Sequence, residues 1–157
     1  MKRLLVVFLV LLALVGCKTV KNDTKIASSL NKRILASGIK GITANPTERG
    51  VTITAGELSF LPDSAEITDE TKGKLDMLAD LIKDYPDRKV LIEGHTANVG
   101  DMESQLSLSK ARAQTVGDYF IAKGAVTADK VVVEGLGGTV PLGDNETEEG
   151  RAMNRRV

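Results

Sequence analysis

The chain has 157 residues, in which 21 basic side chains balance 21 acidic ones and aromatic residues make up 3%. This balance gives no electrostatic reason to expect nucleic acid, and the scarcity of aromatic rings excludes stacking sites for single strands or sugars. One histidine and one cysteine, without the ligand spacing of a zinc site, predict no metal and no cofactor, and they exclude an intrachain disulfide.

Residues 1–16 have the pattern of a secretory signal peptide, with Lys2 and Arg3 ahead of an apolar run and Gly16 at its end. A helix over that run would rise only about 18 Å, short of the roughly 30 Å hydrocarbon core, so a spanning helix is not expected. The ending "LVGC" resembles the lipobox of bacterial lipoproteins, which implies that Cys17 is lipidated with acyl chains such as palmitate. The alternative is an ordinary secretory signal in which Cys17 is incidental.

The next stretch is polar and predicts a short tether. Ile26, Leu30 and Ile34 then recur every four residues and Gly38 follows, which predicts a short amphipathic helix. Alternating residues on both sides of "NPTERG" predict a strand, a turn and a second strand. The predicted divisions are a signal peptide (1–16), a lipidated N-terminus and tether (17–24), a helix with a lead-in strand (25–49) and one further domain (50–157).

Two long helices alternate with strands in the remaining domain. Periodicity and end signals predict one helix from Thr68 to about Tyr85 and another from about Glu103 to Lys123, with strands at "KVLIEG" and "KVVVEGLG". Strands connected through helices pair in parallel, and we expect them in a single sheet. The predicted fold class is α/β, a two-layer sandwich in which helices pack on one face of a small mixed sheet.

Three motifs, "IEGHTANVG", "LSKARAQTV" and "GRAMNRRV", together resemble the OmpA-like C-terminal domain of the peptidoglycan-associated lipoprotein type over roughly residues 50–157. The resemblance implies a βαβαβ fold and a non-enzymatic lipoprotein of the outer membrane with its domain in the periplasm. It also implies non-covalent binding to the diamino acid of the peptidoglycan stem peptide, diaminopimelate or ornithine, which couples the membrane to the cell wall.

The resemblance also implies a set of site residues. Arg112 would bind the carboxylate of the diamino acid, because its planar fork donates two parallel hydrogen bonds. Two positions depart from the family pattern: Ala97 replaces the acid that would take the ammonium, and Gln105 replaces an asparagine. The predicted ligand-binding residues are Arg112, Asp63, Thr96, Asn98, Gln105, Ala97 and Arg155.

Losing the acid at position 97 removes a charged hydrogen bond and should weaken binding by roughly 10- to 100-fold. Three alternatives follow from this departure. Asp63 or Asp101 substitutes for the missing acid, the wall carries ornithine instead of diaminopimelate, or the domain no longer binds peptidoglycan and serves as an interaction module for another envelope protein. The retained Arg112 favours the first two.

We do not predict a catalytic role for His95, because a catalytic histidine needs a nucleophile or an activating partner and the sequence pattern indicates neither. We expect a strand-end histidine that bonds backbone. A wall hydrolase is the weakest hypothesis, since the chain lacks the paired acids or metal ligands of such an enzyme. The acidic stretch "NETEEG" predicts a flexible loop without the ligand order of a calcium site.

Overall fold

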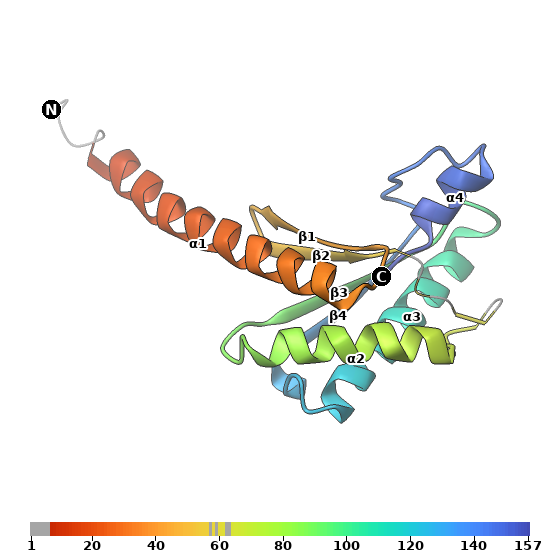
Figure 1. The fold of residues 1–157 in the computed structure, drawn as a ribbon. Helices are drawn as coiled ribbons and strands as arrows, with labels where there is room; N and C mark the ends of the chain where they lie inside the picture. The colour runs from red at the N-terminus through yellow and green to blue at the C-terminus, as the bar shows by residue number, and fades with distance from the viewer. Residues whose placement is uncertain (1–6, 57, 59, 62–63) are drawn as a thin grey trace, which may run out of the picture. The chain divides into compact units, whose positions relative to one another are not determined.

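The computed structural model describes residues 7–56, 58, 60–61 and 64–157, with side chains described from residue 22 onward (Figure 1). These residues form two compact units, one ending at Thr54 and the other beginning at Ala55.

The first unit combines one long helix with a hairpin. Helix α1 (Val7–Ser37) packs on strand β1 (Ile42–Thr47), which is joined by a two-residue turn to β2 (Gly50–Ala55). A connection this short requires antiparallel pairing. Gly38 ends the helix with a φ of +72°, as predicted. Helix residues Ala27, Leu30 and Ile34 are buried together with Ile42 and Ala44 of β1.

Residues 17–24, predicted to be a short polar tether, lie within α1, which runs through them without a break. No glycine or proline occurs between Cys17 and Ser37, so nothing in the backbone interrupts the helix. Among the described residues, no helix combines the length and the apolar character needed to cross a membrane. The signal peptide and the lipidation of Cys17 stay predictions, and residues 1–6 lie outside the described residues.

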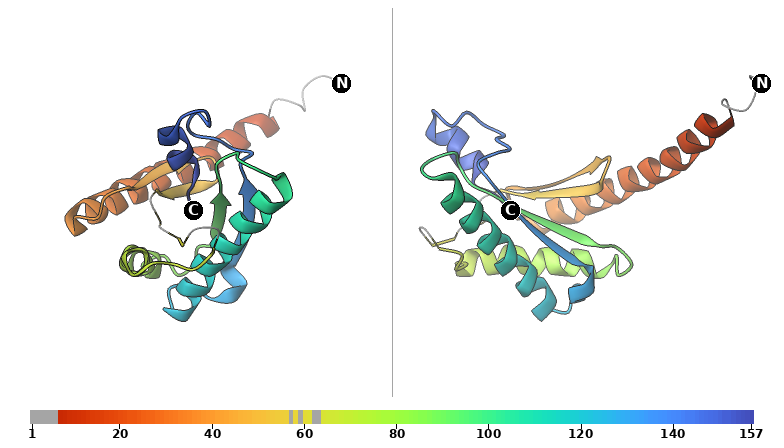
Figure 2. Two further views of the ribbon diagram at one scale, coloured as in Figure 1. Left: turned by 90° about the vertical axis from the view of Figure 1, so that its right-hand side faces the viewer. Right: turned by 180° about the vertical axis from the view of Figure 1, so that it is seen from behind.

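The second unit is built around a parallel strand pair. In chain order it contains α2 (Asp69–Lys83), β3 (Val90–His95), α3 (Met102–Ala122), a 3₁₀ turn η1 (Ala128–Lys130), β4 (Val131–Gly137) and α4 (Glu148–Asn154). Helix α3 packs on both strands and α2 packs on α3, which gives the predicted two-layer α/β architecture (Figure 2). Thr68 caps α2 as expected, accepting a hydrogen bond from the backbone N–H of Thr71.

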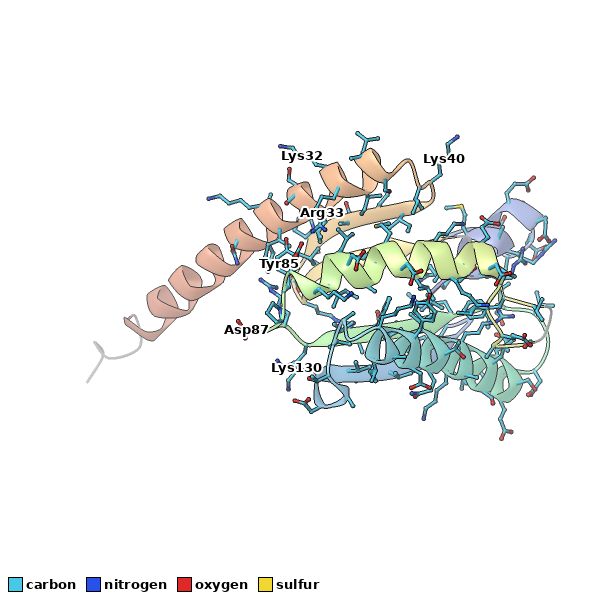
Figure 3. The ribbon with its side chains drawn as sticks, turned by 60° about the horizontal axis from the view of Figure 1, so that its bottom comes forward. Lys32, Arg33, Lys40, Tyr85, Asp87 and Lys130 are labelled. Atoms are coloured by element: carbon cyan, nitrogen blue, oxygen red, sulfur yellow. The ribbon has the colours of Figure 1, made fainter. Side chains whose placement is uncertain are left out.

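Strands β3 and β4 run parallel from the pair Val90 and Val131 to the pair Gly94 and Gly135. An irregularity then places His95 opposite Gly137. At the amino ends of the strands, the Lys130 ammonium donates to the Pro86 carbonyl oxygen at 2.7 Å, close to the turn that contains Tyr85 and Asp87 (Figure 3).

The prediction of a single sheet is wrong, since β1 pairs with β2 and β3 pairs with β4 in two separate two-stranded sheets. At the C-terminus, Arg156 forms isolated antiparallel bridges to both His95, the last residue of β3, and Gly56.

Helix α3 approaches the strands at two glycines that lie opposite each other. A Cβ on Gly94 would lie 2.0 Å from the Ser109 carbonyl oxygen, and a Cβ on Gly135 would lie 2.5 Å from the Lys110 nitrogen. Only glycine permits this distance between backbones. The part of α3 that faces these glycines includes the buried Ser109 and Ala113, whereas Ala111 of the same helix is exposed.

Helix α4 was not predicted, and the flexible acidic loop expected from "NETEEG" is partly helical. Thr147 caps this helix by accepting a hydrogen bond from the Gly150 N–H at 3.0 Å. Glu148 and Glu149 occupy the first turn, where carboxylates stabilise a helix. This cap and acid pattern was the sequence signal that could have revealed the helix.

Candidate functional site

The "HTANVG" motif forms a loop at the carboxyl end of β3, which we call the 96–101 loop. Its first residue, Thr96, donates its backbone N–H to the Gly137 carbonyl oxygen at 2.9 Å. Its last residue, Asp101, caps α3 and accepts the Ser104 N–H at 2.9 Å. These two bonds fix both ends of the loop against the strand pair and the helix.

Gln105 closes the loop from the helix side. Its Nε2 donates to the carbonyl oxygens of Val99 at 3.2 Å and of Gly100 at 3.0 Å. The side chain is buried, and it is one methylene longer than the asparagine of the family pattern. In this structure the predicted ligand residue Gln105 therefore shapes the loop.

Three buried polar atoms at this end of the strands have no hydrogen-bond partner among the described residues: His95 Nδ1, Thr96 Oγ1 and Gln105 Oε1. Unpaired buried groups of this kind are uncommon, and they concentrate where a protein binds water or ligand. They belong to consecutive strand-end residues and to the helix that covers the loop.

His95 is a strand-end residue that bonds backbone, as expected. Its N–H donates to the Arg156 carbonyl oxygen at 2.9 Å, and its imidazole is buried. Burial first, and then the positive charge of Arg156, lower the pKa of His95 from the usual 6.5 to about 4, although Glu93 acts in the opposite direction. The imidazole is therefore neutral at pH 7.

Arg112 lies on the same side of α3 as Gln105, because seven residues complete nearly two turns and rise about 10 Å. Its Nε donates to the Ser64 carbonyl oxygen at 2.9 Å, and its guanidinium lies 5.0 Å from the centre of the Phe60 ring. Phe60 pairs with Ile67 in an isolated antiparallel bridge. The arginine that the motif singled out therefore contacts two residues of the segment ahead of α2, Phe60 and Ser64.

Ala97 and the candidate acid Asp101 differ in their exposure. Ala97 is buried, with 7% of its surface exposed, and it places no polar side chain in the loop. Asp101 is exposed, and its hydrogen bonds from the backbone and side chain of Ser104 lower the pKa of its carboxyl below the usual range. Asp63 lies outside the described residues. Among the residues that are described, no group of three or more His, Cys, Asp or Glu could hold a metal ion.

The C-terminal arginines make intramolecular contacts. Arg155 forms an exposed ion pair with Glu148, at 2.6 Å between Nη2 and Oε1. Arg156 donates to the carbonyl oxygens of Val140 at 3.0 Å and of Asn154 at 3.3 Å. The sequence prediction concentrated on these arginines and missed Asn154, the residue of "NRRV" with the most hydrogen bonds.

Asn154 is 1% exposed and organises the segment ahead of α4. Its Oδ1 accepts the N–H groups of Leu142 and Gly143, and its Nδ2 donates to the Gly143 carbonyl oxygen and to Asn145 Oδ1. Asn145 Oδ1 also accepts the Asn98 N–H of the 96–101 loop at 2.9 Å. Nothing in the local sequence pattern indicates such a connection between positions 98, 145 and 154.

Comparison with known families gives a match to the OmpA family over residues 59–155. The chain belongs to the OmpA family. The match spans Phe60 and Ser64, the 96–101 loop, α3 and α4, so the resemblance inferred from three short motifs is confirmed.

Two proteins with known names are similar to this chain. The peptidoglycan-binding protein ArfA of Mycobacterium tuberculosis is 40% identical over 105 residues, which cover 67% of this chain and 32% of ArfA. The probable lipoprotein YiaD of Escherichia coli is 34% identical over 64% of this chain and 45% of its own. The chain thus spans less than half the length of either relative.

A solved structure matches the OmpA-family fold of this chain. The peptidoglycan-associated lipoprotein of Burkholderia pseudomallei superposes with a TM-score of 0.57 at 30% identity, over 63% of this chain and 83% of that one.

Proposed function

We propose that this protein is an outer membrane lipoprotein whose second unit binds peptidoglycan stem peptides non-covalently in the periplasm. Membership of the OmpA family supports this function, and so do similarities to a peptidoglycan-binding protein and to lipoproteins. The observation that carries it is Arg112, a guanidinium braced between Phe60 and Ser64 on the side of α3 that also holds the 96–101 loop.

In this proposal Arg112 binds the carboxylate of the stem-peptide diamino acid. A planar guanidinium held by an aromatic face and a carbonyl loses little freedom when a carboxylate arrives, so its hydrogen bonds contribute more to affinity. Thr96 and Asn98 lie in the loop, and the buried Thr96 hydroxyl, which has no partner among the described residues, is placed to bind a ligand or water. Arg155 contacts ligand only if its ion pair with Glu148 opens.

Ala97 sets the preference for the diamino acid. Without a carboxylate at this position the ammonium must find another anion, either Asp63 or the exposed Asp101. Asp101 already accepts hydrogen bonds from Ser104, which leaves it less able to pair an ammonium. A wall that contains ornithine, which lacks the distal carboxylate, would change what the pocket must pair.

The proposed role is not enzymatic. His95 is buried, neutral and bonded through its backbone, and no nucleophile approaches it in the contacts described above. General acid or base work at pH 7 needs a group whose pKa lies near 7, and about 4 is too low for that task.

The deciding experiment is a pull-down of the full chain, purified in detergent, with sacculi from its own organism and from a diaminopimelate-type species. Arg112→Ala should abolish binding, and Arg112→Lys should retain only part of it because the bidentate fork is lost. Lys110→Ala removes an equal charge from an exposed position of the same helix and should bind normally. Ala97→Asp should gain roughly 10- to 100-fold on the diaminopimelate wall.

Equal binding by the unmutated protein and by Arg112→Ala would overturn the proposal. A second function would then stand, that of a module binding another envelope protein. One observation favours it: Val99, Met102 and Leu106, at the loop and the start of α3, are 63%, 53% and 38% exposed. Exposed apolar side chains gathered in this way are typical of interaction surfaces.

A further inference from the structure

The 96–101 loop is held by two different parts of the second unit. From α3, Gln105 donates to the carbonyl oxygens of Val99 and Gly100. From the segment before α4, Asn145 accepts the Asn98 N–H across 47 residues of sequence. The loop that lines the proposed ligand site is therefore held by the segment ahead of α4, which contains none of the predicted ligand-binding residues.

Asn145 is itself held in place by a hydrogen bond from Asn154. One acceptor atom, Asn145 Oδ1, takes hydrogen bonds from both the Asn98 N–H and the Asn154 Nδ2, each at 2.9 Å. Arg151 adds a bond from Nη1 to the Asn145 carbonyl oxygen at 2.8 Å. Two residues of α4, Arg151 and Asn154, therefore hold Asn145, whose Oδ1 in turn holds the 96–101 loop.

The two asparagines use their amides differently. Asn154 uses both ends, since Oδ1 accepts two backbone N–H groups and Nδ2 donates to two oxygens. Asn145 uses only its oxygen in the contacts that link it to Asn98 and Asn154. A carboxylate can replace an amide that only accepts, but not one that must also donate.

We propose that Asn145, oriented by Asn154, is a positioning residue for the ligand-binding loop, so that the C-terminal segment 142–154 sets the affinity of the site. This inference rests on the proposed function. It adds that residues with no expected ligand contact control binding through the backbone of Asn98. Loss of one such hydrogen bond should weaken binding by roughly 3- to 10-fold.

The test uses aspartate and alanine at each position, in the full chain in detergent. Asn145→Ala should weaken sacculus binding and speed hydrogen exchange at the Asn98 amide. Asn145→Asp keeps the acceptor and should restore both. Asn154→Asp loses the donor and should behave like Asn154→Ala. The Thr96 amide, bonded to Gly137, serves as the internal control, because its exchange should stay slow wherever the strand pair remains intact.

The outcomes separate the two proposals. Asn145→Ala that binds sacculi like the unmutated protein, or that leaves Asn98 exchange unchanged, overturns the positioning role. Equal loss in Asn145→Asp and Asn145→Ala also overturns it, since the acceptor alone would then not suffice. If the unmutated protein binds no sacculi, the proposed function fails, and Asn98 exchange alone decides whether Asn145 holds the loop.

Discussion

His95 is a motif residue whose buried position favours the neutral form of its imidazole. Its backbone pairs with Arg156, and its buried ring lies close enough to that guanidinium for a protonated imidazole to be repelled. The neutral form is therefore the one that fits. Two other buried polar atoms nearby, Thr96 Oγ1 and Gln105 Oε1, also have no hydrogen-bond partner within the described part of the chain.

The imidazole should titrate far below the usual range. We expect its pKa to be about 4. Because the chain has one histidine, a single set of imidazole signals in a proton NMR titration measures it directly. A value close to 6.5 would show that the ring is solvated, and it would contradict the buried position.

The same shift predicts how stability depends on pH. The unfolded chain takes up a proton near pH 6.5 and the folded chain only near 4, so the folded state is fully stabilised above 6.5. The free energy of unfolding should fall as pH drops from 6.5 towards 4, by on the order of 3 kcal/mol. His95→Gln keeps a neutral polar side chain and should flatten the urea-denaturation profile between pH 6.5 and 5, where few other groups titrate.

At the scale of elements, the close approach of α3 to the strands determines which residues can line the interface. Gly94 and Gly135 admit the helix backbone, and Ser109 links the two layers by accepting the Gly137 N–H at 2.9 Å. Ala113 and Gly117 continue the small-residue face. Packing here is backbone against backbone, and it places Gln105 and Arg112 next to the loops they hold.

Two glycine-to-alanine substitutions test this packing. Gly94→Ala places a Cβ 2.0 Å from the Ser109 carbonyl oxygen and should destabilise the fold by about 1 to 3 kcal/mol, since a backbone atom cannot move aside cheaply. Gly73→Ala in α2 meets nothing within 4 Å and should stabilise by roughly 0.5 to 1 kcal/mol. Urea denaturation of both variants measures the difference. Equal effects would mean that α3 does not press on β3.

Helices α2 and α3 are also linked by a polar cluster. Asp76 on α2 accepts the Tyr119 hydroxyl at 2.8 Å and pairs with the Lys123 ammonium at 2.6 Å. Hydrogen bonds from Lys123 and Tyr119 lower the pKa of Asp76, so its contribution to stability is present above the unfolded pKa of about 3.8 and is lost as pH falls through the folded value.

Replacing this carboxylate should therefore matter more at neutral pH than at acidic pH. We expect Asp76→Asn to lower the thermal midpoint at pH 7 and to lower it less at an acidic pH, as the native carboxyl takes up its proton. The control is Asp80→Asn, whose ion pair with Lys83 lies within α2 and links no second helix. A similar loss at both pH values would place the effect in packing instead of charge.

At the scale of the whole molecule, sequence patterns predicted most elements and the family, but not how the strands divide. Caps and periodicity located α2 and α3 within one or two residues because those signals are local. The division into two sheets and the bridges from Arg156 to His95 and Gly56 depend on contacts between residues distant in sequence, which no local pattern describes. The partners of Arg112 and the asparagine connection were missed for the same reason.

Membrane attachment is a property of the whole chain that one substitution tests. Cys17→Ala should abolish incorporation of labelled palmitate and move the protein from the membrane pellet to the soluble fraction. Thr19→Ala, two residues further along, should do neither. Sacculus binding by the detergent-purified protein should be unchanged in both variants, because the proposed ligand site lies in the second unit. Palmitate incorporation into Cys17→Ala would contradict the predicted lipid site.

The unbroken course of α1 has a mechanical consequence. A disordered segment between Cys17 and Ser37 would act as an entropic spring that lengthens under load, whereas a helix over the same residues is a rod of about 30 Å that hardly stretches. Asn31 connects this helix to the hairpin: its Nδ2 donates to the Ala44 carbonyl oxygen at 2.7 Å, and its Oδ1 accepts the Ala44 N–H at 2.8 Å. If Cys17 carries the lipid, a force on the hairpin is transmitted to the membrane with little extension of the chain between them.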